Sequence, residues 1–160
     1  MANRETFRNA KLIFKNFAGK ETQFNMAGKR NFSILIENKE EAERLIADGW
    51  NVKKLKEKPD VPTAWHLKVN VRFDVRPPKV RTVTTVYGKQ KCTDVNEATI
   101  SSLDWMEIEK TDLTIVPYNY NKGAMHGTTA YLETMYVTPV VDELAQEYEF
   151  YEDEGEIPFE

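Results

Sequence analysis

Basic residues are interleaved with aromatic residues over the first 91 positions of the chain. Every Lys and Arg except Lys110 and Lys122 lies in this range. Cations can neutralise the phosphates of a nucleic acid, and flat aromatic rings can stack on its unpaired bases. The pattern therefore predicts a surface that binds a single-stranded polynucleotide, although outward Lys and Arg on a strand can also be a merely solvated face. The expected contact residues are Lys20, Phe24, Lys29, Arg30, Phe32, Trp50, Lys53, Lys54, Lys68, Arg72, Arg76, Arg81, Tyr118 and Tyr120.

Not every aromatic residue is expected at such a surface. Trp65 and Phe73 alternate with apolar neighbours, and Trp105 lies close to Met106 and Ile108, so we expect these three rings in the core. For four of the candidate contact residues, burial remains an alternative to base stacking: Phe24, Trp50, Tyr118 and Tyr120.

The formal net charge of −4 conceals a strong asymmetry along the chain. Residues 139–160 hold nine of the 26 acidic side chains and no Lys or Arg. Residues 1–138 therefore keep 22 basic against 17 acidic side chains, a net charge of +5. The asymmetry predicts two parts, a body (1–138) that binds a polyanion and a disordered acidic tail (139–160) that does not.

The end of the tail combines carboxylates with an apolar tip. Phe159 can act as an apolar anchor, and Pro158 limits the entropy lost on binding. The tail residues expected to dock on a partner are Asp153, Glu154, Glu156, Ile157, Pro158 and Phe159. The alternative is a tail that only aids solubility.

This tip resembles the C-terminal tip of bacterial single-stranded DNA-binding proteins, in which acidic residues precede Ile-Pro-Phe. The resemblance implies docking on basic pockets of replication and repair proteins. In that family Phe is the last residue, whereas Glu160 follows Phe159 here and displaces the free carboxylate by one position.

Catalytic and metal-binding motifs are not evident. The sequence has no phosphate-binding Gly-rich loop and no nucleophile elbow. One Cys and two distant His cannot supply a Cys/His zinc site, so we expect no metal, no cofactor and no enzymatic activity. The main alternative is a metal-dependent nuclease or recombination enzyme, whose carboxylates would come from Asp74, Asp94, Asp104 and Asp112.

The elements that must position these residues are mostly strands. Strands are predicted at 11–17 and 31–37, joined by a long loop, and a short helix follows from the Asn38 N-cap to Gly49. Strict alternation predicts a strand over 65–76. The remaining predicted elements are a strand at 80–87, a short helix at 97–103, and strands at 113–118 and 128–137.

This order predicts a mainly β fold, an OB-fold-like five-stranded barrel with short helices, because a helix precedes the last two principal strands. The body also resembles single-stranded DNA-binding proteins of bacteriophages. The fragments that carry this likeness are Gly28-Lys-Arg-Asn-Phe32, Gly49-Trp-Asn-Val-Lys53, Pro117-Tyr-Asn-Tyr120 and Thr129-Ala-Tyr-Leu132.

This likeness implies an OB-fold and DNA binding through the Lys29 and Arg30 region. We therefore expect a protein that coats and protects single-stranded DNA, with little sequence preference, in replication, recombination or repair. We expect no membrane span, a cytoplasmic location in a bacterial cell or a phage-infected host, and a monomer or dimer.

Overall fold

The strand with the clearest alternation, β5 (Trp65–Val71), pairs with three neighbours in the computed structural model. The structure describes residues 3–23, 25–122 and 125–140. Buried and more exposed side chains lie on opposite faces of β5, as a period of two residues predicts. The core-facing residues are Leu67, Val69 and Val71. The residues on the outer face are His66, Lys68 and Asn70.

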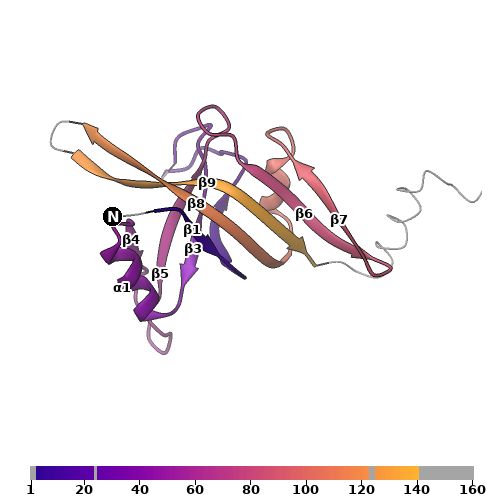
Figure 1. The fold of residues 1–160 in the computed structure, drawn as a ribbon. Coiled ribbons are helices and arrows are strands. Elements are labelled where there is room, and N and C mark those ends of the chain that lie inside the picture. The colour runs from indigo at the N-terminus through magenta and orange to yellow at the C-terminus, as the bar shows by residue number, and fades with distance from the viewer. Residues whose placement is uncertain (1–2, 24, 123–124, 141–160) are drawn as a thin grey trace, which may run out of the picture.

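Two helical segments and eight further strands complete the described part of the chain (Figure 1). In chain order they are β1 (Glu5–Phe7), β2 (Lys11–Asn16), β3 (Arg30–Ile36), α1 (Lys39–Ala47), β4 (Val52–Lys54), β6 (Lys79–Val86), β7 (Lys89–Val95), the 3₁₀ helix η1 (Ile100–Asp104), β8 (Ile108–Lys122) and β9 (Met125–Pro139).

The strand order is that of a partly open OB-type barrel. β2 pairs with β3 and β3 with β5, both antiparallel, and β5 then pairs with β9 in parallel. β9 pairs with β8 in a long antiparallel hairpin. The Ala10 N–H donates to the Thr111 carbonyl at 2.7 Å across the seam between the ends of the barrel. The mainly β, five-stranded prediction is confirmed.

Three short or polar strands escaped prediction. β1 pairs with the outer edge of β8, and β4 pairs with β5. β7 forms a hairpin with β6, which itself pairs in parallel with β9. The hairpin turns at Tyr87 and Gly88, both with positive φ, as a tight two-residue turn requires. β7 is almost entirely exposed, so it lacks the apolar alternation that reveals a strand.

The strand predicted over 65–76 ends early, at Val71. The Arg76 N–H donates to the Arg72 carbonyl at 2.9 Å, which closes a turn. The apolar alternation continues through Phe73, which packs at the edge of the core, but Val75 is 56% exposed. The extra alternation was therefore not evidence of a longer strand.

The helical predictions were right in part. The Asn38 side chain accepts a hydrogen bond from the Glu41 N–H at 3.1 Å, and Gly49 follows α1 with a φ of +102°. The short helix predicted at 97–103 is the 3₁₀ helix η1, displaced toward the C-terminus. The prediction that Trp105 lies in the core is wrong, since the core-facing side chains of η1 are Ile100 and Leu103. Trp105 is 77% exposed.

Aromatic rings from β3 and the end of β2 form the centre of the core. The Phe17 and Phe32 rings stack with centroids 5.1 Å apart, and both side chains are fully buried. Asp104, at the end of η1, accepts hydrogen bonds from the N–H groups of Phe17 (2.7 Å) and Ala18 (3.0 Å). This carboxylate fixes the start of the loop that leads to β3.

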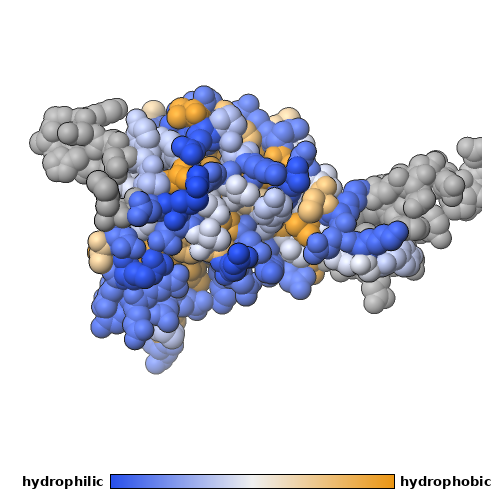
Figure 2. All heavy atoms as spheres, viewed as in Figure 1, coloured by the Kyte–Doolittle hydropathy of each residue, from blue (hydrophilic) through white to orange (hydrophobic). Residues whose placement is uncertain are grey.

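The surface shown in Figure 2 is mostly hydrophilic, with apolar residues in small separate patches. No helix in the described ranges is long and apolar enough to cross a membrane. The predicted tail from residue 141 onward lies outside the described residues, and β9 extends to Pro139, one residue past the predicted boundary.

Replacing Phe32 by alanine tests its place in the core. We expect Phe32→Ala to lower the free energy of unfolding by about 3–5 kcal/mol, because it removes a large buried ring and leaves a cavity. The matched control, Trp105→Ala, deletes an exposed ring and is expected to change stability by less than about 0.5 kcal/mol. Urea denaturation measures both, and equal losses would contradict the assignment of Phe32 to the core.

Candidate nucleic-acid interface

A groove of about 910 Å³ crosses the outer face of four neighbouring strands. These strands are β3, β5, β9 and β8, which can be followed in Figure 1. The loop before β3 and the turn after β5 form its rims. The lining residues are Ala27, Gly28, Lys29, Arg30, Asn70, Val71, Arg72, Phe73, Asp74, Glu97, Tyr118, Thr129 and Tyr131.

Strand register brings the polar and aromatic side chains of the groove together. Asn70 on β5 lies opposite Tyr131 on β9, and Tyr118 on β8 lies opposite Thr129. Directly opposed residues point to the same face of a sheet. The pairing therefore places both tyrosines on one surface, although they are 13 positions apart in the sequence.

The two tyrosine rings form the aromatic part of the groove. The ring centroids of Tyr118 and Tyr131 are 5.2 Å apart, and the ring planes differ by 5°. Such parallel stacking orders both rings before any ligand binds. Tyr118 remains 50% exposed, so the pair offers a flat apolar surface that another ring system can extend.

Arg72 lines the groove together with this pair. Its Nε and Nη2 atoms donate to the two carboxylate oxygens of Asp74, both at 2.9 Å. The hydrogen bond to Asp74 raises the pKa of the Arg72 guanidinium, and Tyr131 and Tyr118 contribute smaller electrostatic effects in the same direction. The same hydrogen bond lowers the pKa of Asp74 to about 2, so the pair is ionised at neutral pH.

Arg30 and Lys29 supply the other positive charges. The Arg30 guanidinium lies 5.9 Å from the centre of the Phe73 ring, a cation–π distance, and 3.4 Å from a carboxylate oxygen of Glu97. Lys29 is exposed beside it. The lining thus carries three cations and two carboxylates, all on side chains that solvent reaches.

The structure brings together four of the predicted contact residues and disperses the others. Lys29, Arg30, Arg72 and Tyr118 line the groove. The remaining cations, outside the lining, are Lys20, Lys53, Lys54, Lys68, Arg76 and Arg81.

Several of these outlying cations have neighbours of their own. Lys54 forms an ion pair with Glu57 at 2.7 Å, and Arg81 forms one with Asp94 at 2.7 Å. Lys68 is exposed on the outer face of β5, where it extends the positive surface beyond the groove.

Two of the predicted stacking residues belong to the core instead. Phe32 is fully buried against Phe17, and Trp50 is 2% exposed after the turn that ends α1. Their rings are covered by protein, so neither offers a surface to a base. Phe24 lies outside the described residues. Tyr120 has its backbone in β8, opposite Gly127, and its side chain is likewise outside the described part.

Sequence reasoning missed five polar or aromatic residues of the groove, among them the carboxylates Asp74 and Glu97, and misplaced Phe73. Tyr131 lies between Ala130 and Leu132, which are both buried, and that alternation would have indicated an outward ring. Asn70 and Thr129 are also outward strand residues, but small polar side chains give no such signal. Phe73 was expected in the core, whereas it reaches both the core edge and the groove.

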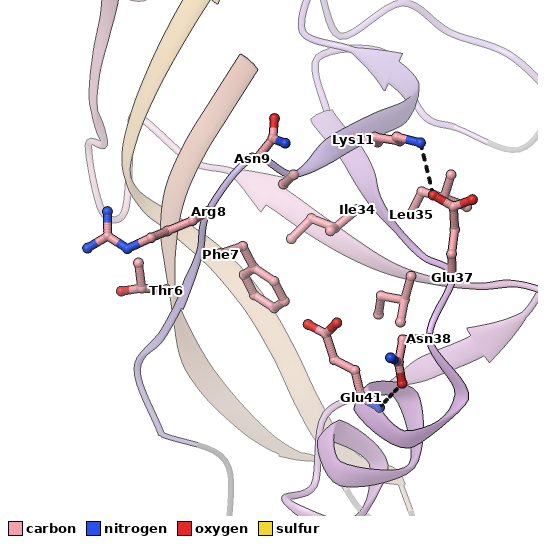
Figure 3. Close-up of a pocket in the computed structure, with 12 residues that line it drawn as sticks. Thr6, Phe7, Arg8, Asn9, Lys11, Ile34, Leu35, Glu37, Asn38 and Glu41 are labelled. Carbon is pink, nitrogen blue, oxygen red and sulfur yellow. Dashed lines mark hydrogen bonds and ion pairs between the residues drawn. The ribbon is translucent and has the colours of Figure 1, made fainter. Parts of the chain in front are cut away.

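A smaller depression of about 290 Å³ lies where β1, the chain before β2, the end of β3 and the start of α1 meet. In Figure 3 the Phe7 ring lies between the side chains of Ile34 and Glu41. Lys11 and Glu37 form an ion pair of 3.0 Å at its edge. This pocket has no aromatic stack and lies outside the groove.

The four aspartates considered for a nuclease site have separate structural partners. Asp74 binds Arg72, and Asp94 binds Arg81. Asp104 holds backbone N–H groups at the end of β2, and Asp112 accepts from the Asn9 N–H at 2.8 Å. Within the described ranges, no group of three or more potential ligands is placed to hold a metal ion.

The Arg72–Asp74 pair can be tested by titration. We expect Arg72→Gln to raise the pKa of Asp74 from about 2 toward 3.8, because the mutation removes the cation that favours the carboxylate. Because the pKa is lower in the folded chain, the pair's stabilisation is present above about pH 4 and is lost as pH falls through about 2. NMR titration of the Asp74 carboxyl carbon measures this pKa. Arg81→Gln is the control, and an unchanged Asp74 pKa in Arg72→Gln would contradict the pairing.

Comparisons with known proteins agree with this architecture. The family model described as "putative phage ssDNA-binding domain" matches residues 3–158. The structure is similar to a single-stranded DNA-binding protein from bacteriophage Enc34, with a TM-score of 0.52, 10% sequence identity, and coverage of 88% of this chain and 83% of that chain.

A second structure of the Enc34 protein, in complex with ssDNA, matches with a TM-score of 0.51, 11% identity and 88% coverage of both chains. At these identities the likeness supports the fold alone. None of the curated proteins compared with the chain matches its sequence. Since the family model spans nearly the whole chain, this protein belongs to the phage ssDNA-binding domain family.

Proposed function

We propose that the protein binds and protects single-stranded DNA in the groove between the loop before β3 and the β8–β9 hairpin. The observation that carries this proposal is the ordered stack of Tyr118 on Tyr131 beside the Arg72 guanidinium. Family membership supports the same ligand class.

The groove supplies both kinds of contact that a single strand needs. A base can stack on the exposed ring of Tyr118, and stacking accepts any base because each one has a π face. Lys29, Arg30 and Arg72 can contact the phosphates on either side. Duplex DNA keeps its bases stacked on one another, so it cannot use the tyrosine surface without melting. The groove therefore favours unpaired strands with little sequence preference.

Arg72 exchanges Asp74 for a phosphate when DNA binds. Its guanidinium already lies in a two-pronged arrangement with a carboxylate, and the same geometry fits a phosphate. Asp74 therefore keeps Arg72 oriented in the unbound protein. No step in this binding requires a metal, a cofactor or catalysis.

The acidic tail has a separate role in this proposal. Residues Ile157, Pro158 and Phe159, with the carboxylates before them, dock on replication or repair proteins in a bacterial cell or phage-infected host. The body carries a net charge of +5 and the tail nine acidic residues, so the tail also competes with DNA for the basic surface.

Removing the tyrosine surface is expected to weaken binding to single strands. A base stack is worth roughly 1–3 kcal/mol, so Tyr118→Ala lowers affinity for an oligothymidylate by about 5- to 150-fold. Trp105→Ala, which removes an exposed ring outside the groove, leaves affinity unchanged. Fluorescence anisotropy titrations with single-stranded and duplex DNA of equal length measure both variants.

The same titrations test the proposed function as a whole. If three cations contact phosphates, log K falls with log salt with a slope of about −2. Equal affinity for duplex and single strand, or no binding by the wild-type chain, would overturn the proposal. Magnesium-dependent degradation of the labelled oligonucleotide would favour the nuclease alternative.

Deleting residues 142–160 is expected to raise DNA affinity at low salt, and the gain shrinks as salt screens the tail. Phe159→Ala separates the two roles of the tail, because it keeps the tail's charge. It is expected to leave DNA affinity unchanged while abolishing binding to purified polymerase or helicase subunits that bind the wild-type chain. An unchanged affinity of the deletion variant across a salt series would exclude competition between tail and DNA.

A further inference from the structure

Phe14 has a backbone conformation that is rare for an aromatic residue within a strand. Four non-glycine residues in the described ranges have positive φ: Asn9, Phe14, Asp60 and Tyr87. Asn and Asp tolerate this region, and Tyr87 lies in the tight turn of the β6–β7 hairpin. Phe14 lies within a strand, with a φ of +51°. An aromatic residue in this region is strained, and such strain is concentrated at functional sites.

A β-bulge directs this strained residue outward. The β2–β3 register shifts between Ile13 and Asn16, and Phe14 lies within the shift. Bulges of this kind re-aim a side chain away from the regular alternation. The Phe14 side chain is 62% exposed, so the strain is not offset by burial of the ring in the core.

The Phe14 ring is nevertheless held in place by a side chain on β5, which lies beyond β3 in the sheet. It makes an edge-to-face contact with the His66 ring on β5, with centroids 5.5 Å apart and planes at 82°. His66 Nδ1 is 3.1 Å from the Oγ atom of Ser33, which is 3% exposed. Burial, and to a smaller extent Lys53, lower the pKa of His66, so its ring is uncharged at neutral pH. Two ordered, uncharged rings thus meet on the outer face.

Cations flank the two rings. Lys53 on β4 lies directly opposite His66, and Lys68 on β5 lies directly opposite Ser33. Both lysines are exposed. Like the tyrosine groove, the patch therefore combines an exposed aromatic ring with positive charge on either side. We call Phe14, His66, Lys53 and Lys68 the second platform.

The second platform and the groove share one face of the sheet. His66 and the groove residue Asn70 lie four residues apart on β5 and point to the same side, so they are separated by about 13 Å. Lys68 lies between them on that face. OB-folds cover roughly 4–16 nucleotides of a single strand. A DNA strand that extends past one stacked base can therefore reach from the groove to the second platform.

From this arrangement, and resting on the proposed function, we infer that the second platform is a further nucleotide-binding site for the same DNA strand. The exposed face of Phe14 stacks on a base, and Lys53 and Lys68 contact its phosphates. The strand runs along β5 from the tyrosine groove toward β4. Oligonucleotides long enough to span both sites use both, and short ones occupy the groove alone.

Two oligothymidylates, of about 2 and about 16 nucleotides, separate the two sites in full-length protein at one-to-one stoichiometry, because only the longer one spans both. Phe14→Gly removes the ring and accepts a positive φ, so the variant is expected to fold with an unchanged or higher melting temperature. We expect it to bind the long oligonucleotide about 5- to 150-fold more weakly, with no change for the short one. Phe14→Trp keeps a stacking surface and retains the long-oligonucleotide affinity.

Tyr87→Asn is the matched control, because it also removes an exposed aromatic side chain at a positive φ, here at the β6–β7 turn. It is expected to leave both affinities unchanged, and a loss equal to that of Phe14→Gly would overturn the inference. If Phe14→Gly binds the long oligonucleotide with wild-type affinity, the inference is also overturned. The proposed binding in the groove then still stands, provided that Tyr118→Ala weakens the binding of both oligonucleotides. Failure of the wild-type chain to bind either oligonucleotide would instead overturn the proposed function.

Discussion

The pairing register of β5 is the constraint on which the rest of the structure depends. The strand is bonded to β3 along one edge and to β4 and β9 along the other, and its side chains alternate strictly between core and outer face. A shift of one residue would turn Leu67, Val69 and Val71 outward and bury Lys68. Because such a shift is costly, the outer face of β5 stays polar. The side chains that β5 contributes to the groove and to the second platform therefore stay on that face.

Irregularities around β5 then provide the features that bind. The chain leaves the ladder after Val71, which places Arg72 and Phe73 at the rim of the groove. The bulge in β2 presents Phe14, and the Asp104 carboxylate holds the end of the same strand against η1. A regular barrel with the same core would present neither the paired Arg72 nor the exposed Phe14. The binding surface is therefore made where regular strand geometry ends.

The fold could be predicted where one face of an element is buried. The alternation of β5, the Asn38 cap and the apolar runs of β2 and β3 each reflect a local rule that tertiary contacts reinforce. Prediction failed where the local pattern and the tertiary contacts do not agree. β7 has no buried face to produce a pattern, and Phe73 continued the pattern after the strand had ended. Trp105 is apolar beside apolar neighbours, yet η1 buries Ile100 and Leu103 instead.

The sequence by itself determined which kinds of chemistry the chain can perform. Charge balance, the cations before residue 91 and the acidic Ile-Pro-Phe tail are properties of composition and order, and they do not depend on pairing. Only the tertiary structure decided which side chains act together. Phe32 and Trp50 are as aromatic as Tyr118 and Phe14, but long-range strand pairing buries the first two and exposes the others. The reason is physical: whether a ring is covered depends on which distant segments pack against it, and no local pattern contains that information.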